Sequence, residues 1–342
     1  MKKIILIFLL VLCKQISAQV VDSLKIKTDS IQTKIDSLEV KIDSLEIKKE
    51  EIIKADTIRR WKKGGIGAIN FAQSSFTNWA AGGENALSAA ALLSVYANYK
   101  KNKTTWDNTL DLAYGMIQSG KSPLRKNEDK IDFSSKYGRH IKETKLYYSA
   151  LVNFKSQFDV GYNFPDDTTV ISRFLAPAYV LAAIGFDYKP NDYLSLFVSP
   201  VTSKTTIVAD QKLADAGAYG VAKAEYDTAG VKIKDGQMVR SEFGGYLRFT
   251  FKKDIFKNVN FATKLELFSN YLNNPQNIDV NWENIVGLKI NKYLSASIST
   301  NMIYDHDIPV PVTEDVNGLP VTRTGPRLQF KQVLAVGFSY KF

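Results

Sequence analysis

The feature that most constrains the fold of this chain is a long series of short segments in which apolar and polar residues alternate. A period of two residues is typical of a β-strand with one apolar face. Each segment is close to the ~9–11 residues that a tilted strand needs to cross a membrane. About twelve such segments occur, give or take two. They span Gly64–Ala72, Leu87–Lys100, Thr105–Gln118, Lys130–Gly138, Leu146–Asp159, Phe174–Tyr188, Tyr193–Thr202, Met238–Lys252, Val259–Tyr271, Ile278–Ile290, Leu294–Tyr304 and Arg327–Phe342.

The connections between these segments are sorted by length. The short ones follow the even-numbered segments and are Lys101–Thr104, Arg139–Lys145, Lys189–Asp192, Lys253–Asn258 and Asn291–Tyr293. The long ones follow most of the odd-numbered segments and are Gln73–Ala86, Ser119–Asp129, Ser203–Gln237 and Asp305–Pro326. Short turns at one end and long loops at the other are typical of outer-membrane barrels, whereas a soluble sandwich does not sort its loops in this way. The sequence therefore predicts an all-β fold, a transmembrane antiparallel up-and-down β-barrel.

The first residues have the order of a secretory signal peptide. Lys2 and Lys3 precede the apolar run Ile4–Leu12, and Ser17-Ala18 offers a cleavage site of small residues. The run is too short to span a bilayer, which takes about 20 residues. We expect residues 1–18 to be removed, so that the mature chain begins at Gln19 without the single cysteine, Cys13. Lipid attachment at Cys13 is the less favoured alternative, because the bulky Leu12 precedes it.

The last strand-like segment ends on alternate apolar residues, namely Leu334, Val336, Phe338, Tyr340 and Phe342. The aromatic residues Phe338, Tyr340 and Phe342 resemble the C-terminal strand signal of bacterial outer-membrane proteins. This resemblance implies insertion by the barrel assembly machinery and contact with outer-membrane lipid. The chain also has 17 Tyr and 19 Phe, a number that aromatic girdles at two membrane interfaces would explain.

A different pattern, a repeat of seven residues, occupies the chain before the strands. Asp-Ser followed by Leu or Ile recurs at Asp22, Asp29, Asp36 and Asp43. Such a repeat favours a helix that packs against another helix, with Lys at every g position and Glu at e positions available for pairing. A second apolar stripe, Ile26, Val40 and Ile47, lies nearly opposite the first. The residues expected to bind a protein partner or a second copy are Leu24, Ile31, Ile35, Leu38, Ile42 and Leu45.

Neither an enzyme nor a nucleic-acid-binding protein is indicated. The formal net charge is +10, but no nucleic-acid-binding motif is present, and a secreted chain seldom meets nucleic acid. The two histidines, His140 and His306, are expected in connections rather than on strand faces, so a Ser-His pair has no support. The run Asp305-His306-Asp307 is interpreted as a solvated loop, because three adjacent residues cannot all point at one metal ion. We expect no catalytic residue, cofactor or metal.

The segment from Gly64 to Gly83 is the most distinctive stretch among the strands. It contains Asn70-Phe71-Ala72-Gln73 and Asn78-Trp79-Ala80-Ala81-Gly82-Gly83-Glu84-Asn85, so Gln73, Asn78, Trp79, Gly82 and Gly83 could form a binding or plug loop at the rim. The alternative is a structured turn that only closes the barrel wall. These runs, with Trp61 before Gly64-Gly65, resemble a Bacteroidota outer-membrane β-barrel family known only as a domain of unknown function (3078). The resemblance extends from Trp61 to Phe342, and it implies an outer-membrane barrel without an assigned activity.

Together these features predict a signal peptide over residues 1–18, a periplasmic heptad-repeat helix over 19–60 and an outer-membrane barrel over 61–342. Two functions remain open. The first is a non-enzymatic structural or accessory subunit of a larger outer-membrane assembly, for example protein insertion or export machinery. The second is a narrow channel or transporter for small or apolar solutes. In that case inward polar residues, for which we expect Asn108, Asp111, Glu266, Asn284 and Lys289, would line the pore or pair with one another inside it.

Overall fold

The protein consists of two compact units, Met1–Arg60 and Trp61–Phe342. The computed structural model describes residues 2–58, 60–75, 84–316 and 319–342. The first unit is a single helix, α1 (Lys2–Ile58), which includes the heptad repeats. Among the described residues, no helix has both the length and the apolar character needed to cross a membrane.

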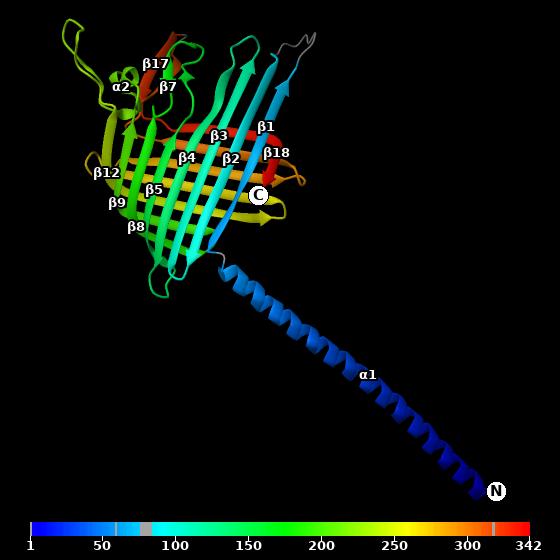
Figure 1. Ribbon diagram of the computed structural model, residues 1–342. Coiled ribbons are helices and arrows are strands. Elements are labelled where there is room, and N and C mark those ends of the chain that lie inside the picture. Colours follow the sequence, from blue (N-terminus) through cyan, green and yellow to red (C-terminus); the bar gives the residue numbers. More distant parts are fainter. Residues whose placement is uncertain (1, 59, 76–83, 317–318) are drawn as a thin grey trace. The chain divides into compact units, whose positions relative to one another are not determined.

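The second unit is a closed barrel of twelve antiparallel strands (Figure 1). Each strand pairs with the next barrel strand along the chain, and β18 closes the barrel against β1. The prediction of an up-and-down barrel of about twelve strands is therefore confirmed. The barrel strands are β1 (Trp61–Ser74), β2 (Ala86–Lys101), β3 (Thr104–Ser119), β4 (Arg125–His140), β5 (Leu146–Ser156), β8 (Ala178–Asn191), β9 (Leu194–Ile207), β12 (Val239–Phe256), β13 (Val259–Asn270), β14 (Ile278–Lys289), β15 (Leu294–Tyr304) and β18 (Gln329–Lys341).

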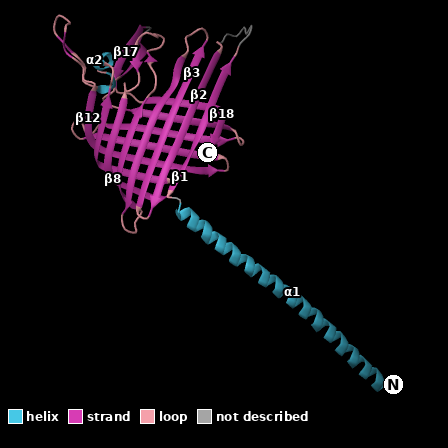
Figure 2. Ribbon diagram, viewed as in Figure 1, coloured by secondary structure: helices cyan, strands magenta, loops and turns pink. Residues whose placement is uncertain are grey.

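The alternation of side chains in each strand separates an outer wall from a lumen. In β13, for example, Leu265 and Leu267 lie on the outer face, while Lys264, Glu266 and Phe268 point into the lumen. Successive residues of a strand point to opposite faces, so a sequence that alternates apolar and polar residues gives an apolar outside and a polar inside. Figure 2 shows the strands of the two opposite walls crossing as a lattice.

Short turns join the strands at one end of the barrel, which we call the short-turn end. Two residues connect β2 to β3, β8 to β9, and β12 to β13. Asn102 and Asn258 in two of these turns have φ angles of 52° and 68°. Tight hairpin turns commonly include a residue with positive φ, and asparagine adopts it more readily than most residues. The short turns therefore lie where the sequence predicts them.

The opposite end, the long-loop end, carries small elements that the sequence does not predict. The long connections contain three two-stranded sheets and two short helices, and the sheets pair β6 with β7, β10 with β11, and β16 with β17. Part of this end has its own apolar core of Ala176, Val208, Leu213, Ala214 and Val221. These elements are β6 (Gly161–Tyr162), β7 (Val170–Ser172), α2 (Gln211–Asp215), the 3₁₀ helix η1 (Ala218–Gly220), β10 (Glu225–Tyr226), β11 (Lys232–Lys234), β16 (Val310–Val316) and β17 (Leu319–Gly325).

Candidate functional site

The predicted partner-binding residues of α1 form an uncovered apolar column. Leu24, Ile31, Ile35, Leu38, Ile42 and Leu45 are between 42% and 64% exposed. The opposite stripe is exposed as well, and Val40 and Ile47 are 69% and 61% exposed. A helix with a one-sided apolar stripe normally buries that stripe. Both stripes are exposed along the helix, so both present apolar surface that another molecule can cover.

The polar positions of α1 are arranged so that they leave the apolar column free. Ser37 and Ser44 donate hydrogen bonds to the carbonyl oxygens of Lys34 and Lys41 in the preceding turn, at 2.9 and 2.8 Å. Such backbone bonds keep a serine side chain folded against its own helix. The serines therefore do not extend over the column.

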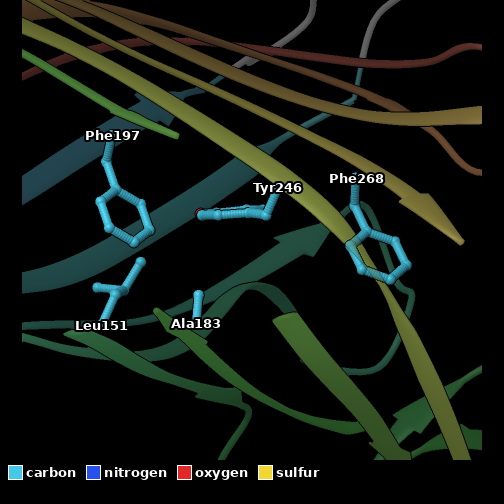
Figure 3. Close-up of a cluster of buried hydrophobic side chains, with 5 residues drawn as sticks. All are labelled: Leu151, Ala183, Phe197, Tyr246 and Phe268. Atoms are coloured by element: carbon cyan, nitrogen blue, oxygen red, sulfur yellow. The ribbon is translucent and has the colours of Figure 1, made fainter. Parts of the chain in front are cut away.

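Inside the barrel, one part of the lumen is filled by apolar side chains. Leu151, Ala183, Phe197, Tyr246 and Phe268 form a buried cluster contributed by five neighbouring strands, β5, β8, β9, β12 and β13 (Figure 3). The rings of Phe197 and Tyr246 meet edge to face with their centroids 6.3 Å apart. The packing of these side chains fixes the spacing of five strands that also carry charged residues of the lumen.

Next to this apolar cluster, charged side chains join opposite walls of the barrel. Arg248 Nη2 lies 2.6 Å from Glu266 Oε1, and Lys155 Nζ lies 2.6 Å from Glu266 Oε2. The same network continues through Lys264, whose Nζ is 3.2 Å from Asp132, and through Lys130, whose Nζ is 3.3 Å from Glu283. We call these residues the central ion-pair cluster. It ties β4 and β5 to β12, β13 and β14 across the lumen.

Two further groups of ion pairs lie toward the ends of the lumen. At the short-turn end, Lys136 and Lys189 both pair with the fully buried Asp187, at 2.6 and 3.5 Å. At the long-loop end, Lys204 lies 2.7 Å from Asp279 and 3.5 Å from Asp305. Burial of an unpaired charge costs free energy, and these ion pairs offset that cost at both ends of the lumen.

The structure corrects two of the five residues predicted to point inward. Glu266 and Asp111 do face the lumen, and Lys289 lies exposed at the end of β14. Asn108 and Asn284, however, lie on the outer wall, where Asn108 accepts a hydrogen bond from Ser135 Oγ at 2.8 Å and Asn284 donates to Thr300 Oγ1 at 3.3 Å. The reason is parity, because Asn108 and Asp111 are an odd number of residues apart and cannot share a face.

The outer wall carries an apolar surface with an aromatic band at the short-turn end. The ring of Trp61 lies 5.2 Å from that of Tyr99 and 5.8 Å from that of Trp106. Tyr148 and Phe186 continue the band on β5 and β8, with a centroid distance of 5.5 Å. Above it, the wall exposes large apolar side chains, among them Ile69, Leu93, Phe133, Val152, Ile184, Val198, Phe243, Ile298 and Leu334.

The C-terminal residues form the line at which the barrel closes, which we call the seam. Phe338 and Tyr340 point outward from β18 and are 63% and 66% exposed. Phe342 exchanges two backbone hydrogen bonds with Gly65 of β1, at 2.9 and 3.0 Å. The predicted assembly residues are thus the outward residues of the closing strand.

The lumen beside the seam is lined differently from the opposite wall. Small residues face it from β18 and β15, namely Ala335, Gly337, Ser339, Ser295, Ser297 and Ser299. Ile66 of β1 and Leu92 of β2 also face inward, yet they are 42% and 39% exposed. Space therefore remains next to these apolar side chains, in contrast to the filled region around Glu266.

Of the predicted rim loop, Gln73 lies in β1, and Asn78, Trp79, Gly82 and Gly83 fall outside the described residues. His140 is the last residue of β4 rather than part of a turn, and its ring is 4.7 Å from that of Tyr147. The expectation that neither histidine lies on a strand was wrong for His140, because β4 continues two residues further than its alternation indicated.

The segment around His306 is occupied by ion pairs. Asp305 lies 3.5 Å from Lys204 and Asp307 lies 3.4 Å from Arg240, so both carboxylates have basic partners. Within the described part of the chain, no three His, Cys, Asp or Glu side chains are grouped as metal ligands.

Comparison with known proteins finds a match to one family model over part of the chain and a set of similar barrels. Residues 71–162, from the end of β1 to β6, match a family described as "Protein of unknown function (DUF3078)". The match supports the predicted resemblance over a shorter stretch than the sequence indicated. A search of curated proteins finds no match.

Among solved structures, an outer membrane channel from Pseudomonas putida F1 is 10% identical, with 82% of this chain and 94% of that chain covered and a TM-score of 0.36. The translocator domain of the autotransporter NalP from Neisseria meningitidis is 9% identical, with 82% and 88% covered and a TM-score of 0.30. The NanC porin is 8% identical, with 80% and 98% covered and a TM-score of 0.30. TM-scores this low carry no information on activity or partners.

Proposed function

We propose that this chain is a non-enzymatic integral outer-membrane protein whose barrel anchors a partner-binding helix in the periplasm, as a structural or accessory subunit of a larger assembly. Machinery for protein insertion or export is one such assembly. The observation that carries the proposal is the apolar column of α1, which keeps its seven-residue register and is uncovered along its described length. A sustained seven-residue register is expected of a helix that packs against another helix, since an isolated surface helix follows a period of 3.6.

The membrane location is supported by the outer wall. Strand pairing in a closed barrel satisfies the backbone groups that hydrocarbon cannot hydrogen-bond. The outward apolar side chains of this barrel match the hydrocarbon region of a bilayer. Aromatic residues such as Trp61, Tyr99 and Trp106 gather where a membrane interface would lie. We propose that the short-turn end faces the periplasm, because outer-membrane barrels have their short turns on that side, and that α1, which precedes β1 in the chain, is periplasmic as well.

An anchoring role rather than transport is supported by the filled part of the lumen. The central ion-pair cluster joins opposite walls, so a solute would have to displace paired charges in order to pass there. A barrel of twelve strands is narrower than porins of about 16–18 strands, which leave an aqueous channel, so inward side chains can meet across its lumen.

The test of the helix uses a photo-reactive amino acid at single positions in living cells. Placed at Leu38, in the apolar column, it should give a discrete cross-linked protein product. Placed at Ser37, which faces away from the column and lies one turn before Val40 of the opposite stripe, it should give little or none of that same product. Equal cross-linking at the two positions, or none at either, would show that the column has no partner.

The second candidate function is a narrow channel or transporter for small or apolar solutes. The exposed inward side chains of Ile66 and Leu92 favour it, because they leave apolar lumen surface uncovered beside the seam. Purified protein in planar bilayers distinguishes the two functions. The anchoring proposal expects little or no conductance, and a large, steady conductance would put transport first.

A further inference from the structure

The seam between β1 and β18 is closed over only part of its length. The two strands pair through five residues, from Ile66 opposite Lys341 to Asn70 opposite Gly337. Every other pairing between neighbouring barrel strands involves at least ten residues, as between β15 and β18. Above Asn70, β1 continues to Ser74 and β18 extends back to Gln329, but these portions do not pair with each other. Figure 1 shows β1 running on past the region where β18 meets it.

The unpaired portion of β18 directs backbone hydrogen-bonding groups toward this gap. Phe342 exchanges bonds with Gly65, while the N–H of Ser339 donates to Tyr293 on the other side of β18. In an antiparallel ladder alternate residues bond to opposite neighbours, so the even-numbered residues of β18 face β1. The residues whose N–H and C=O groups therefore face the gap are Phe330, Gln332, Leu334 and Val336. Within the described chain, no strand pairs with this edge.

The side chains around the gap place this open edge at the depth of the apolar wall. Phe330, Leu334 and Val336 point outward and are 57%, 69% and 48% exposed, and Phe71 across the gap is 58% exposed. An open sheet edge in contact with lipid is poorly tolerated, because hydrocarbon cannot hydrogen-bond to the backbone. A lipid chain would leave these groups unsatisfied, whereas a polypeptide strand would bond to them.

We infer that an extended segment of a second outer-membrane polypeptide adds a strand to the open edge of β18 at Gln329–Val336. β18 already accepts a strand, β1, along the lower half of the same edge, so the added strand continues an existing ladder. The outward residues around the gap require apolar side chains at alternate positions of that segment. The inward residues on β18 nearest the paired seam, Val333 and Ala335, have short side chains that leave room for its other side chains, and Lys331 farther up is directed to Glu128 at 2.7 Å. The inference rests on the proposed membrane location but not on the partner of α1.

The first experiment asks whether the gap exists in the purified protein. Two pairs of cysteines are compared in a Cys13→Ser background, and both pairs point into the lumen. Ala68→Cys with Ser339→Cys lies in the paired seam and should form a disulfide readily. Ala72→Cys with Ala335→Cys would be opposed only if the same register continued upward, and it should remain reduced. Equally rapid oxidation of both pairs would mean that the seam is closed, which would overturn the inference.

The second experiment measures strand addition by amide hydrogen exchange in detergent. The probe is a synthetic peptide of this chain's own Ile66–Ser74, a sequence that already pairs with the β18 edge. We expect the amides of Phe330, Gln332, Leu334 and Val336 to exchange rapidly in the free protein, and about tenfold or more slowly with the peptide bound.

Two N-methylated versions of the peptide provide the matched control. Methyl groups on the amides of Ile69 and Phe71 block the edge that faces β18, and that peptide should give no protection. Methyl groups on Ala68 and Ala72 block the other edge, and that peptide should still protect. Equal effects of the two peptides, no protection by any peptide, or full protection before peptide is added would each contradict the inference. None of these outcomes depends on α1. The inference and the proposed function can therefore fail independently of each other.

Discussion

Arg248 and Glu266 illustrate how strongly side chains are coupled inside this barrel. Both are 6% exposed, and Arg248 donates from Nε and Nη2 to the same carboxylate oxygen at 3.0 and 2.6 Å. Tyr246 and Lys155 bond to the same carboxylate group. Replacing a whole buried pair by apolar residues is often tolerated, but removing one partner leaves an unpaired buried charge.

We therefore predict that Glu266→Leu lowers the free energy of unfolding by about 3–5 kcal/mol, because Arg248 and Lys155 lose their shared partner. The matched control is Glu128→Leu, which removes the partner of Lys331, a side chain that is 50% exposed, and should cost about 0–1 kcal/mol. Denaturant unfolding of the detergent-solubilised barrel measures both. Similar losses in the two variants would show that the lumen network is as well solvated as the rim.

Two glycines of the seam permit a second comparison. A Cβ at Gly337 would overlap the backbone oxygen of Ile69 and the side chain of Asn70, whereas a Cβ at Gly67 would meet nothing within 4 Å. We predict that Gly337→Ala destabilises the barrel by about 1–3 kcal/mol through overpacking, while Gly67→Ala has little effect or stabilises slightly. The temperature at which the folded gel band is lost measures the difference. A neutral Gly337→Ala would mean that the seam already opens at this point.

Among the elements, the loop around α2 has an acidic residue, Asp215, that accepts three hydrogen bonds. Asp215 accepts hydrogen bonds from Lys232 Nζ at 2.8 Å, Gln211 Nε2 at 2.7 Å and the N–H of Gly236 at 2.8 Å. These bonds, with that from Lys232 the largest contribution, lower the pKa of the Asp215 carboxyl to about 2. In the unfolded chain its pKa would be about 3.9, so ionisation of Asp215 stabilises this loop.

This lowered pKa predicts a pH-dependent loop. The stabilisation is fully present above about pH 4 and is lost as the pH falls toward 2. Hydrogen exchange at the Gly236 amide, corrected for the intrinsic effect of pH, should become faster over that interval. Asp215→Asn should show fast exchange already at neutral pH, and little further change on acidification. An identical pH profile for the two proteins would show that other groups hold the loop.

At the same scale, the sequence predicts the barrel elements well and the loop elements poorly. The strands follow from a period of two and from turns of fixed length, so β15 has the bounds Leu294–Tyr304 that the sequence indicates. The elements of the long loops span two to seven residues and depend on distant contacts, such as those of Leu213 with Ala176 in one apolar cluster. Local pattern carries no signal for such contacts.

The candidate site shows the same limit. The apolar column of α1 can be predicted because it is a local repeat. An ion pair such as that of Lys130 with Glu283 depends on which walls face each other across the lumen, and nothing in the sequence around either residue indicates that. Asn108 was predicted to face inward because it is polar, although its parity in β3 places it on the apolar outer wall. The side chain of Asn108 accepts a hydrogen bond from Ser135, and Ser135 accepts one from Trp106 Nε1. These partners are known only from the three-dimensional structure.

At the scale of the whole molecule, the two units have different surfaces and, in the proposed function, different tasks. The barrel is a sheet closed by β1 and β18, with ion pairs joining its walls in part of the lumen, and the helix carries an uncovered apolar column. An apolar column exposed to water costs free energy that a partner helix would recover, at about 1.5–3 kcal/mol for each large side chain buried. We therefore expect the protein to be part of a larger complex.

The most direct test is the size of the complex extracted from native outer membranes with mild detergent. The wild-type protein should migrate on native gels as a discrete species larger than one chain in its detergent micelle. Leu38→Asp with Leu45→Asp should reduce it to the single chain, because charges cannot be buried in the column. Ser37→Asp with Ser44→Asp adds the same charges outside the column and should leave the complex intact. If all three proteins migrate as the single chain, or all three as the same large species, the column is not a partner-binding surface and the proposed function is wrong.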